Sequence, residues 1–245
     1  MISTHQPWFR RFVGFYLLII LFQGKATALE GYYTEETVRE PAQGQRGDYI
    51  FIRKTWYAGD RMRKDEEWKG ITIARFDKNV FYVLDPKTET YFEITPAMFR
   101  KYSEFGMRSF GALEDKSGKL YFPDDLLIRT ETSKTIGNWE CYQVMTNPRY
   151  RSPDRPYVVI WYSYAVDFPS QIYAAQMKKF FNSAPEIESL FRQIQSFEGY
   201  PVRTESHGIS ALVVNTLYKI EWRADLDPSL FELPTEYQKV TVPER

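Results

Sequence analysis

The residue types that most often carry catalysis are scarce along this chain. There is one cysteine, Cys141, and there are two histidines, His5 and His207. A structural Cys/His zinc site needs about four such ligands, which excludes that class of metal site. Cys141 falls in a predicted strand between Glu140 and Tyr142, away from any helix N-terminus or cation cluster that would activate a thiol. We therefore expect Cys141 to be a buried, inert side chain.

Other catalytic patterns are missing as well. Gly106 and Gly111 lack the spacing and the Lys-Ser/Thr ending of a phosphate-binding loop, and no Gly-x-Ser-x-Gly elbow occurs. The adjacent carboxylates of Asp124–Asp125 and Glu66–Glu67 would point to opposite faces of a strand, so adjacency alone does not make an acid–base pair. A hydrolase is therefore the weakest hypothesis, and we expect a protein that is not an enzyme and uses no cofactor or metal.

The aromatic content is the feature that most suggests binding. Phe, Tyr and Trp make up 17% of the 245 residues, within a hydrophobic content of 43% that is typical of a globular protein. These rings have two explanations, a well-filled core or a lined cavity, and the sequence does not decide between them. The formal net charge of zero argues against a nucleic-acid partner. A mean hydropathy of −0.47 excludes a protein with several membrane spans.

The N-terminal segment has the pattern of a secretory signal peptide over residues 1–28. Arg10 and Arg11 precede the apolar run Phe12–Phe22, which is too short to cross the hydrocarbon core of a membrane. Ala26–Ala28 matches the small-x-small cleavage pattern, and no cysteine that could be lipidated lies nearby. We expect cleavage after residue 28, a periplasmic or secreted location, and no stable membrane span afterwards. An uncleaved anchor is the alternative.

The remainder, residues 29–245, is predicted to form a single domain that begins as an antiparallel meander. Short apolar or alternating stretches are separated by closely spaced turns, which leave no room for parallel crossovers. Residues 157–162 are apolar at nearly every position, so both faces of that strand are expected to be covered. The expected strands are 49–52, 54–57, 61–64, 71–76, 80–84, 91–94, 126–132, 139–145, 157–162, 202–205 and 211–222.

Apolar residues at helical spacing predict three helices, over 96–105, 170–184 and 186–198. Each is apolar on one face only and needs a surface to cover, for which the sheet is the obvious partner. Residues 106–124 are expected to form a loop, and 227–237 a closing segment that plugs one end of the sheet. The predicted fold class is α+β, with one large antiparallel sheet and helices on one face.

Several segments share sheet and turn patterns with known proteins: Arg61–Arg63, Gly70–Arg75, Val80–Pro86, Thr90–Tyr91, Ile136–Tyr142, Gly199–Pro201 and Pro228–Pro234. They resemble an uncharacterised family of exported bacterial domains, which is similar in fold to the periplasmic lipoprotein carriers LolA and LolB. The resemblance covers most of residues 31–240, and Thr235–Tyr237 departs from the Gly-Tyr that often follows the last proline in that family. It implies a strongly curved sheet, a half-barrel, with helices on its concave face. In the carriers, the space between sheet and helices holds acyl chains.

Together these observations favour an exported, non-enzymatic binding protein. Its hydrophobic cavity, between sheet and helices, would take an acyl chain, a lipid or a lipoprotein. The candidate lining residues are Met177, Phe180, Phe181, Leu190, Phe191 and Ile194 from the helices, with Trp161 or Trp222 from the sheet.

The alternative is an envelope interaction or sensing module. The same fold is expected in RseB, a periplasmic regulator that contacts a membrane protein partner. In that case the loop 106–124 and the basic, proline-rich connection with Arg149, Arg151 and Arg155 would touch the partner. Solvated loop charges are the simpler explanation of these arginines.

Overall fold

The computed structural model describes residues 28–41, 47–98, 107–108, 110–181, 185–207 and 212–241. The predicted signal peptide lies outside these residues except for Ala28, so its cleavage stays a prediction. Most of the predicted helix 96–105 also lies outside them, although Pro96–Met98 are helical. Among the helices of the described part, none combines the length and the apolar character needed to cross a membrane.

A single large sheet holds twelve of the strands in the described residues. Its order is β14-β6-β5-β4-β3-β2-β1-β13-β12-β11-β10-β9, and every neighbouring pair is antiparallel except β14 and β6. A separate two-stranded sheet pairs β7, Leu113–Glu114, with β8, Leu120–Tyr121, inside the segment expected to be a loop. The twelve strands are β1 Leu29–Pro41, β2 Asp48–Ala58, β3 Arg61–Glu66, β4 Gly70–Arg75, β5 Val80–Asp85, β6 Thr90–Ile94, β9 Leu127–Ile136, β10 Trp139–Thr146, β11 Val158–Ser163, β12 Tyr200–His207, β13 Leu212–Leu226 and β14 Gln238–Lys239.

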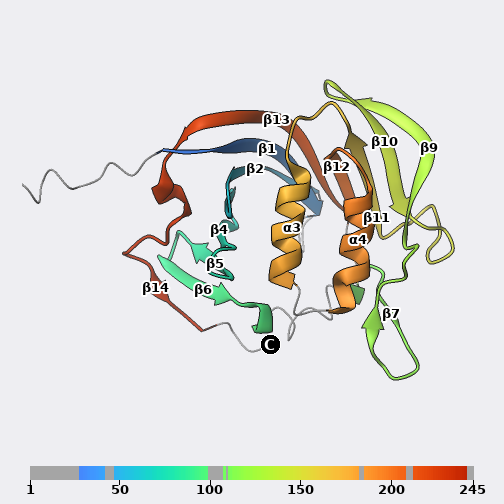
Figure 1. Ribbon diagram of the computed structural model, residues 1–245, viewed down its shortest axis with the longest axis horizontal. Coiled ribbons are helices and arrows are strands. Elements are labelled where there is room, and N and C mark those ends of the chain that lie inside the picture. Colours follow the sequence, from blue (N-terminus) through green and yellow to red (C-terminus); the bar gives the residue numbers. More distant parts are fainter. Residues whose placement is uncertain are drawn as a thin grey trace, which may run out of the picture.

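The large sheet is strongly curved, and two helices lie in its hollow (Figure 1). They are α3, Ser170–Phe181, and α4, Glu188–Ser196, which follows the 3₁₀ turn η1, Pro185–Ile187. Both helices fall within the predicted ranges 170–184 and 186–198. The predicted fold class, an α+β half-barrel with helices on the concave face, is confirmed.

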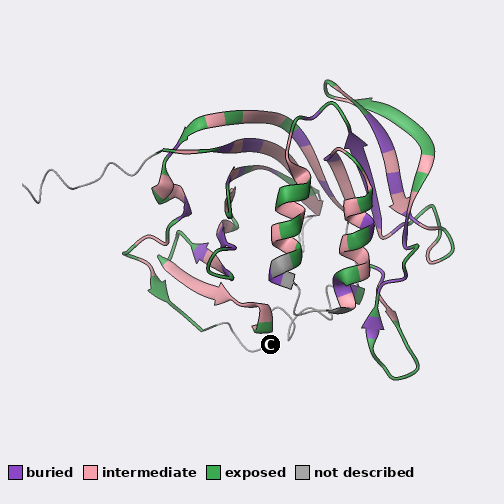
Figure 2. Cartoon of the chain, in the orientation of Figure 1, coloured by how far each residue is buried: buried purple, intermediate pink, exposed green. Residues whose placement is uncertain are grey.

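The helices pack their apolar faces onto two parts of the sheet. Phe180 of α3 joins a buried cluster with Ala74 and Phe76, while Leu190 and Ile194 of α4 pack against a second cluster that includes β11. All six residues of β11 are buried, as predicted from its continuous apolar run (Figure 2). Each half of the sheet is therefore covered by a helix whose apolar stripe matches it.

The chain after α4 turns sharply at Gly199, which has a φ of 94°. A Cβ atom at this position would lie 2.4 Å from the carbonyl oxygen of Ser163, so only glycine permits the close approach to the end of β11. Tyr200 then enters β12 with its side chain buried. The turn brings β12 back beside β11 and places Tyr200 under the helices.

The closing segment forms the 3₁₀ turn η2, Pro228–Phe231. The carboxylate of Asp227 accepts a hydrogen bond from the Ser229 amide at 2.9 Å, which caps this turn. Phe231 is fully buried against Ala58 and Leu226. The expectation that the segment plugs an end of the sheet is confirmed.

Gln193 attaches α4 to the chain before β9. Its buried side chain accepts a hydrogen bond from the Leu127 amide at 2.9 Å and donates one to the Pro123 carbonyl at 2.7 Å. Replacing Gln193 with leucine would leave both backbone groups without partners, and we expect the free energy of unfolding to fall by about 2 kcal/mol. Urea denaturation measures this loss. A midpoint equal to that of the wild type would show that these two bonds do not hold α4 in place.

Candidate functional site

A pocket of about 440 Å³ lies between α3, the end of α4 and the concave side of the sheet. Strands β1, β2, β3, β11 and β12 contribute to its walls together with the turn after β4. Most lining side chains are apolar or aromatic. The aromatic ones are Tyr57, Phe76, Tyr162, Phe168, Tyr173, Phe197 and Tyr200, and the aliphatic ones include Met62, Ala174, Met177 and Ile194.

Four of these rings form one packed group, called here the aromatic cluster: Tyr57, Phe168, Tyr173 and Tyr200. Ring centroids lie 5.1 Å apart for Tyr57 and Phe168, 4.7 Å for Tyr57 and Tyr173, and 4.8 Å for Phe168 and Tyr200. Phe168 precedes α3, and Tyr173 lies in the first turn of this helix. Their rings contact Tyr57 of β2 and Tyr200 of β12, so the start of α3 packs on these two strands. Edge-to-face pairs of this kind add to the area that the rings bury.

The polar part of the lining is acidic and neutral. Glu36 from β1 and Glu198 after α4 are the only charged residues among those that line the pocket, and Ser170, Gln171 and Gln195 are neutral. The lining has no Cys, His, Lys or Arg among the residues that the structure describes. Its chemistry is that of binding by apolar surface, with a few hydroxyl, amide and carboxylate groups to orient a ligand.

Glu36 belongs to a network of charges on the concave side. Its Oε2 atom accepts a hydrogen bond from Nη1 of Arg53 at 3.2 Å, while Nε and Nη2 of Arg53 donate to Oε1 of Glu66 at 2.8 and 2.6 Å. Burial lowers the pKa of Arg53, but the charges of Glu66 and Glu36 outweigh it and leave that pKa raised. Burial likewise opposes ionisation of Glu66, yet Lys64 and Arg53 hold its pKa below the ordinary value.

The tyrosine hydroxyls of the pocket stay protonated over the physiological pH range. Burial is the largest cause that raises the pKa of Tyr57, Tyr162 and Tyr200, and it raises the pKa of Tyr173 to about 12. A neutral phenol donates one hydrogen bond and also accepts. These groups therefore offer a ligand polar contacts without charge.

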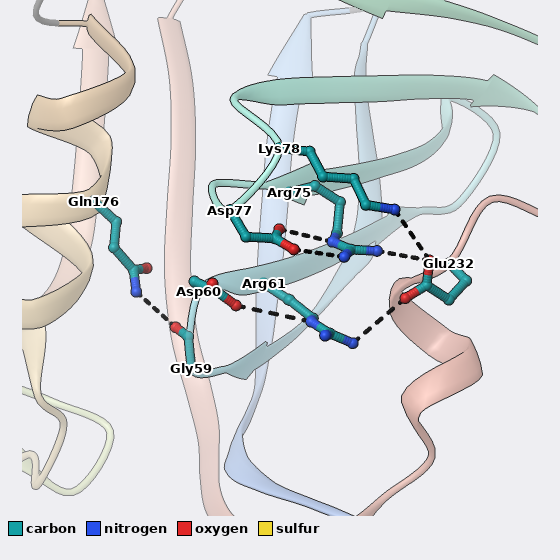
Figure 3. Close-up of polar contacts among 8 residues, drawn as sticks. All are labelled: Gly59, Asp60, Arg61, Arg75, Asp77, Lys78, Gln176 and Glu232. Carbon is teal, nitrogen blue, oxygen red and sulfur yellow. Dashed lines mark hydrogen bonds and ion pairs between the residues drawn. The ribbon is translucent and has the colours of Figure 1, made fainter. Parts of the chain in front are cut away.

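The wall beside α3 is held by the polar contacts drawn in Figure 3. Nε2 of Gln176 on α3 donates to the carbonyl of Gly59, in the turn between β2 and β3, at 2.7 Å. At the end of β4, Arg75 binds Asp77 of the turn between β4 and β5 and Glu232 of the closing segment. These contacts support the segments that carry the lining residues Met62 and Phe76.

Two of the predicted lining residues, Met177 and Ile194, lie at the pocket. Phe180 does not line it, because its ring stacks on Phe81 with centroids 4.1 Å apart inside the core. Leu190 and Phe191 also pack against core clusters and are absent from the pocket lining. These three residues fill the space between helix and sheet beyond the pocket.

Phe181 is the last residue of α3, and its side chain lies outside the described part of the structure. Nothing therefore tests its predicted place at the cavity, which stays a prediction.

Neither predicted tryptophan lines the pocket. Trp161 is buried with Cys141 and Val202 in another cluster, and Nζ of Lys134 lies 3.6 Å from the centroid of its ring. Its neighbour Tyr162 is the residue that faces the pocket, since successive side chains of a strand point to opposite faces. Trp222 is 55% exposed and meets Tyr32 edge to face.

Two of the three arginines in the connection before β11 have side-chain partners within the described part of the chain. Nη1 of Arg149 lies 3.7 Å from a carboxylate oxygen of Asp125, with the Arg149 side chain 74% exposed. The guanidinium of Arg151 lies 4.2 Å from the ring centroid of Tyr157. Arg155 is exposed, and part of the loop 106–124 lies outside the described residues. Contact of this region with an envelope protein stays a prediction.

No protein-family model matches the chain, and no curated protein matches it. Among solved structures, the chain is similar to PNGF-II, with 11% identity over 85% of this chain and a TM-score of 0.36. The aligned part is 30% of the PNGF-II chain, so this chain spans less than a third of that protein.

Two other solved structures are matched over most of their length. One is a LolA superfamily protein from Nitrosomonas europaea, with 9% identity, a TM-score of 0.34, and coverage of 83% of this chain and 90% of that one. The other is described as an outer membrane lipoprotein-sorting protein domain from Vibrio parahaemolyticus, with 9% identity, a TM-score of 0.32, and coverage of 87% and 95%. These likenesses are distant and concern the fold alone.

Proposed function

We propose that this chain is an exported, non-enzymatic binding protein that holds the alkyl or acyl chain of a lipid-like molecule beneath α3 and α4. The observation that supports this is the pocket of about 440 Å³ with mostly aromatic and aliphatic walls. Its volume falls within the about 300–1,000 Å³ that is typical of small-molecule sites. It suits one chain of medium length rather than several chains side by side.

Binding would come from the removal of apolar surface from water. At about 25 cal/mol per Å², binding that removes about 500 Å² of apolar surface from water, counted on the ligand and the pocket together, would gain about 12.5 kcal/mol. Part of this is lost to the entropy of association, which leaves micromolar affinity within reach. The neutral tyrosines and the amides of Gln171 and Gln195 would then orient the polar end of the ligand.

Two measurements on the purified protein test this proposal. Native mass spectrometry is expected to show a co-purified lipid-like molecule, or its uptake after addition. Titration with a neutral naphthylamine probe, whose fluorescence rises in apolar surroundings, is expected to saturate at one site. Absence of any bound molecule together with an unsaturable signal would contradict the proposal.

A pair of neighbouring variants places the binding in this pocket. Ala174 lines the pocket, whereas Ala175 is exposed on the same helix. Replacing Ala174 with tryptophan fills the space, and we expect the probe affinity to fall more than about tenfold, as expected when a ligand loses most of its buried apolar surface. Ala175→Trp is the matched control and is expected to bind as the wild type does. Equal affinities of the two variants would place the probe elsewhere.

A further inference from the structure

We propose that the pocket selects lipid-like molecules whose polar end carries a cationic amine, and that Glu36 is the residue that receives this charge. The inference rests on the proposed function and adds to it the chemical class of the head group. The first observation is the charge of the pocket. Glu36 and Glu198 line it, and no basic residue occurs among the described residues of the lining.

Arg53 is shared between Glu36 and Glu66 and is not part of the pocket lining. Two of its nitrogens bind Glu66, which Lys64 also pairs with at 3.1 Å, and one binds Glu36. Oε1 of Glu36 accepts no hydrogen bond from the described residues, and the side chain keeps 19% of its surface exposed. An ammonium group that enters the pocket therefore meets a carboxylate oxygen with free capacity to accept.

The aromatic cluster lines the same pocket as this carboxylate. Burial is the largest cause that raises the pKa of Tyr57 and Tyr200, and the charge of Glu36 adds to it in both. Aromatic faces attract cations, and the attraction grows where water is excluded. A ring cluster beside a carboxylate is thus favourable for an alkylammonium head group.

The same surroundings oppose an anionic head group. A carboxylate or phosphate brought to the pocket would meet like charge from Glu36 and Glu198, with no lysine or arginine in the lining to offset it. Repulsion between charges is stronger inside a protein than in water, because the effective dielectric constant is lower. The pocket is therefore expected to rank ligands of equal chain length by the charge of their head group.

Three ligands with the same decyl chain test this ranking: decylammonium, which keeps its N–H donors, decyl maltoside and decanoate. Each displaces the neutral naphthylamine probe, below its micelle concentration and at a slightly alkaline pH where decanoate is ionised. We expect the cation to bind about tenfold more tightly than the anion, with the maltoside between them. Equal affinities, or a preference for decanoate, would overturn the charge selection and leave the proposed function standing. Failure of all three to bind would instead contradict the proposed function.

Glu36→Gln tests the residue. We expect it to reduce the ratio between the affinities for the cation and the anion from about tenfold to about twofold, since the carboxylate charge is lost. Glu35→Gln makes the same change in net charge at a neighbour that binds Tyr33 and Tyr218 and does not line the pocket. This control is expected to keep the full ratio.

A preference that survives Glu36→Gln unchanged would overturn the assignment of Glu36. If that variant fails to fold, Glu36→Asp replaces it. This variant moves the charge back on a shorter side chain and is expected to reduce the preference for the cation to about threefold. A preference that stays at about tenfold in this variant would count against Glu36.

Discussion

Replacing Phe180 with alanine is expected to lower the free energy of unfolding by about 3–5 kcal/mol, the range found when a large aromatic side chain is removed from a core. Phe180 is 1% exposed, and its ring lies parallel to that of Phe81 with an angle of 7° between them. It belongs to the cluster that joins α3 to the turn after β4 and to the chain before β9. Deleting the ring leaves a cavity between helix and sheet.

The effect should extend to ligand binding, because α3 also carries three lining residues, Tyr173, Ala174 and Met177. We expect Phe180→Ala to weaken binding of the naphthylamine probe in addition to lowering stability. Guanidinium denaturation and probe titration measure the two effects. Ile172→Ala on the same helix is the matched control, since Ile172 is 57% exposed, and it should change stability by less than about 0.5 kcal/mol. Equal losses in both variants would show that Phe180 does not anchor the helix.

The sequence was sufficient to predict the elements with a clear hydrophobic period. The continuous apolar run that became β11 and the stripes that became α3 and α4 are buried where the periodicity places them. The antiparallel sheet with helices on one face followed from these elements, and its curvature into a half-barrel was implied by the family resemblance. Periodicity works here because each of these segments buries apolar side chains along one continuous face.

Strand β1 was not among the predicted strands, although it lies in the middle of the sheet between β2 and β13. Its sequence has polar residues at neighbouring positions, with Glu35 next to Glu36. In the structure each carboxylate has its own partners, Tyr33 and Tyr218 for Glu35 and Arg53 for Glu36. Tyr33 is local to β1, but Tyr218 and Arg53 lie far away in the sequence, so the local pattern does not predict that both glutamates fit in a strand.

The pocket was predictable in its location but only partly in its residues. Met177 and Ile194 come from the helical stripes, but a helix face does not show which of its positions fill the core and which border a space. Glu36, Tyr57 and Tyr200 were missed because their roles depend on strand register and on the close turn at Gly199. Strand parity was the signal available for Tyr162, since its neighbour Trp161 must then face away.

Replacing Arg75 with methionine is expected to lower the free energy of unfolding by about 2–3 kcal/mol, since it removes a buried cation whose charge-assisted hydrogen bonds join two part-exposed carboxylates. The Arg75 side chain is 5% exposed. Its Nε and Nη2 atoms donate to the two oxygens of Asp77 at 2.8 and 2.6 Å, and Nη1 donates to Glu232 at 2.6 Å (Figure 3). Arg75 thus connects the end of β4 to the closing segment. The substitution removes its hydrogen bonds to Asp77 and to Glu232 at the same time.

The loss of unfolding free energy in Arg75→Met should depend on pH. The hydrogen bond from Arg75 is the first cause that holds the pKa of Asp77 below its ordinary value. A carboxyl whose pKa is lower in the folded than in the unfolded protein contributes stability that is complete above the unfolded pKa, about 3.9 for Asp, and is lost as the pH falls through the folded pKa. The difference in stability between wild type and Arg75→Met should therefore narrow below about pH 4.

Lys78→Met provides the matched control for this network. Nζ of Lys78 lies 3.7 Å from the same Glu232 carboxylate, but its side chain is half exposed. Exposed ion pairs contribute little, so we expect a loss of less than about 1 kcal/mol at neutral pH. Urea denaturation at neutral and acidic pH compares the three proteins. The contribution of the Arg75–Asp77 pair must vanish once Asp77 is protonated in both the folded and the unfolded state. A difference in the free energy of unfolding between Arg75→Met and wild type that stays constant on acidification would therefore mean that ionised Asp77 does not stabilise the protein through Arg75.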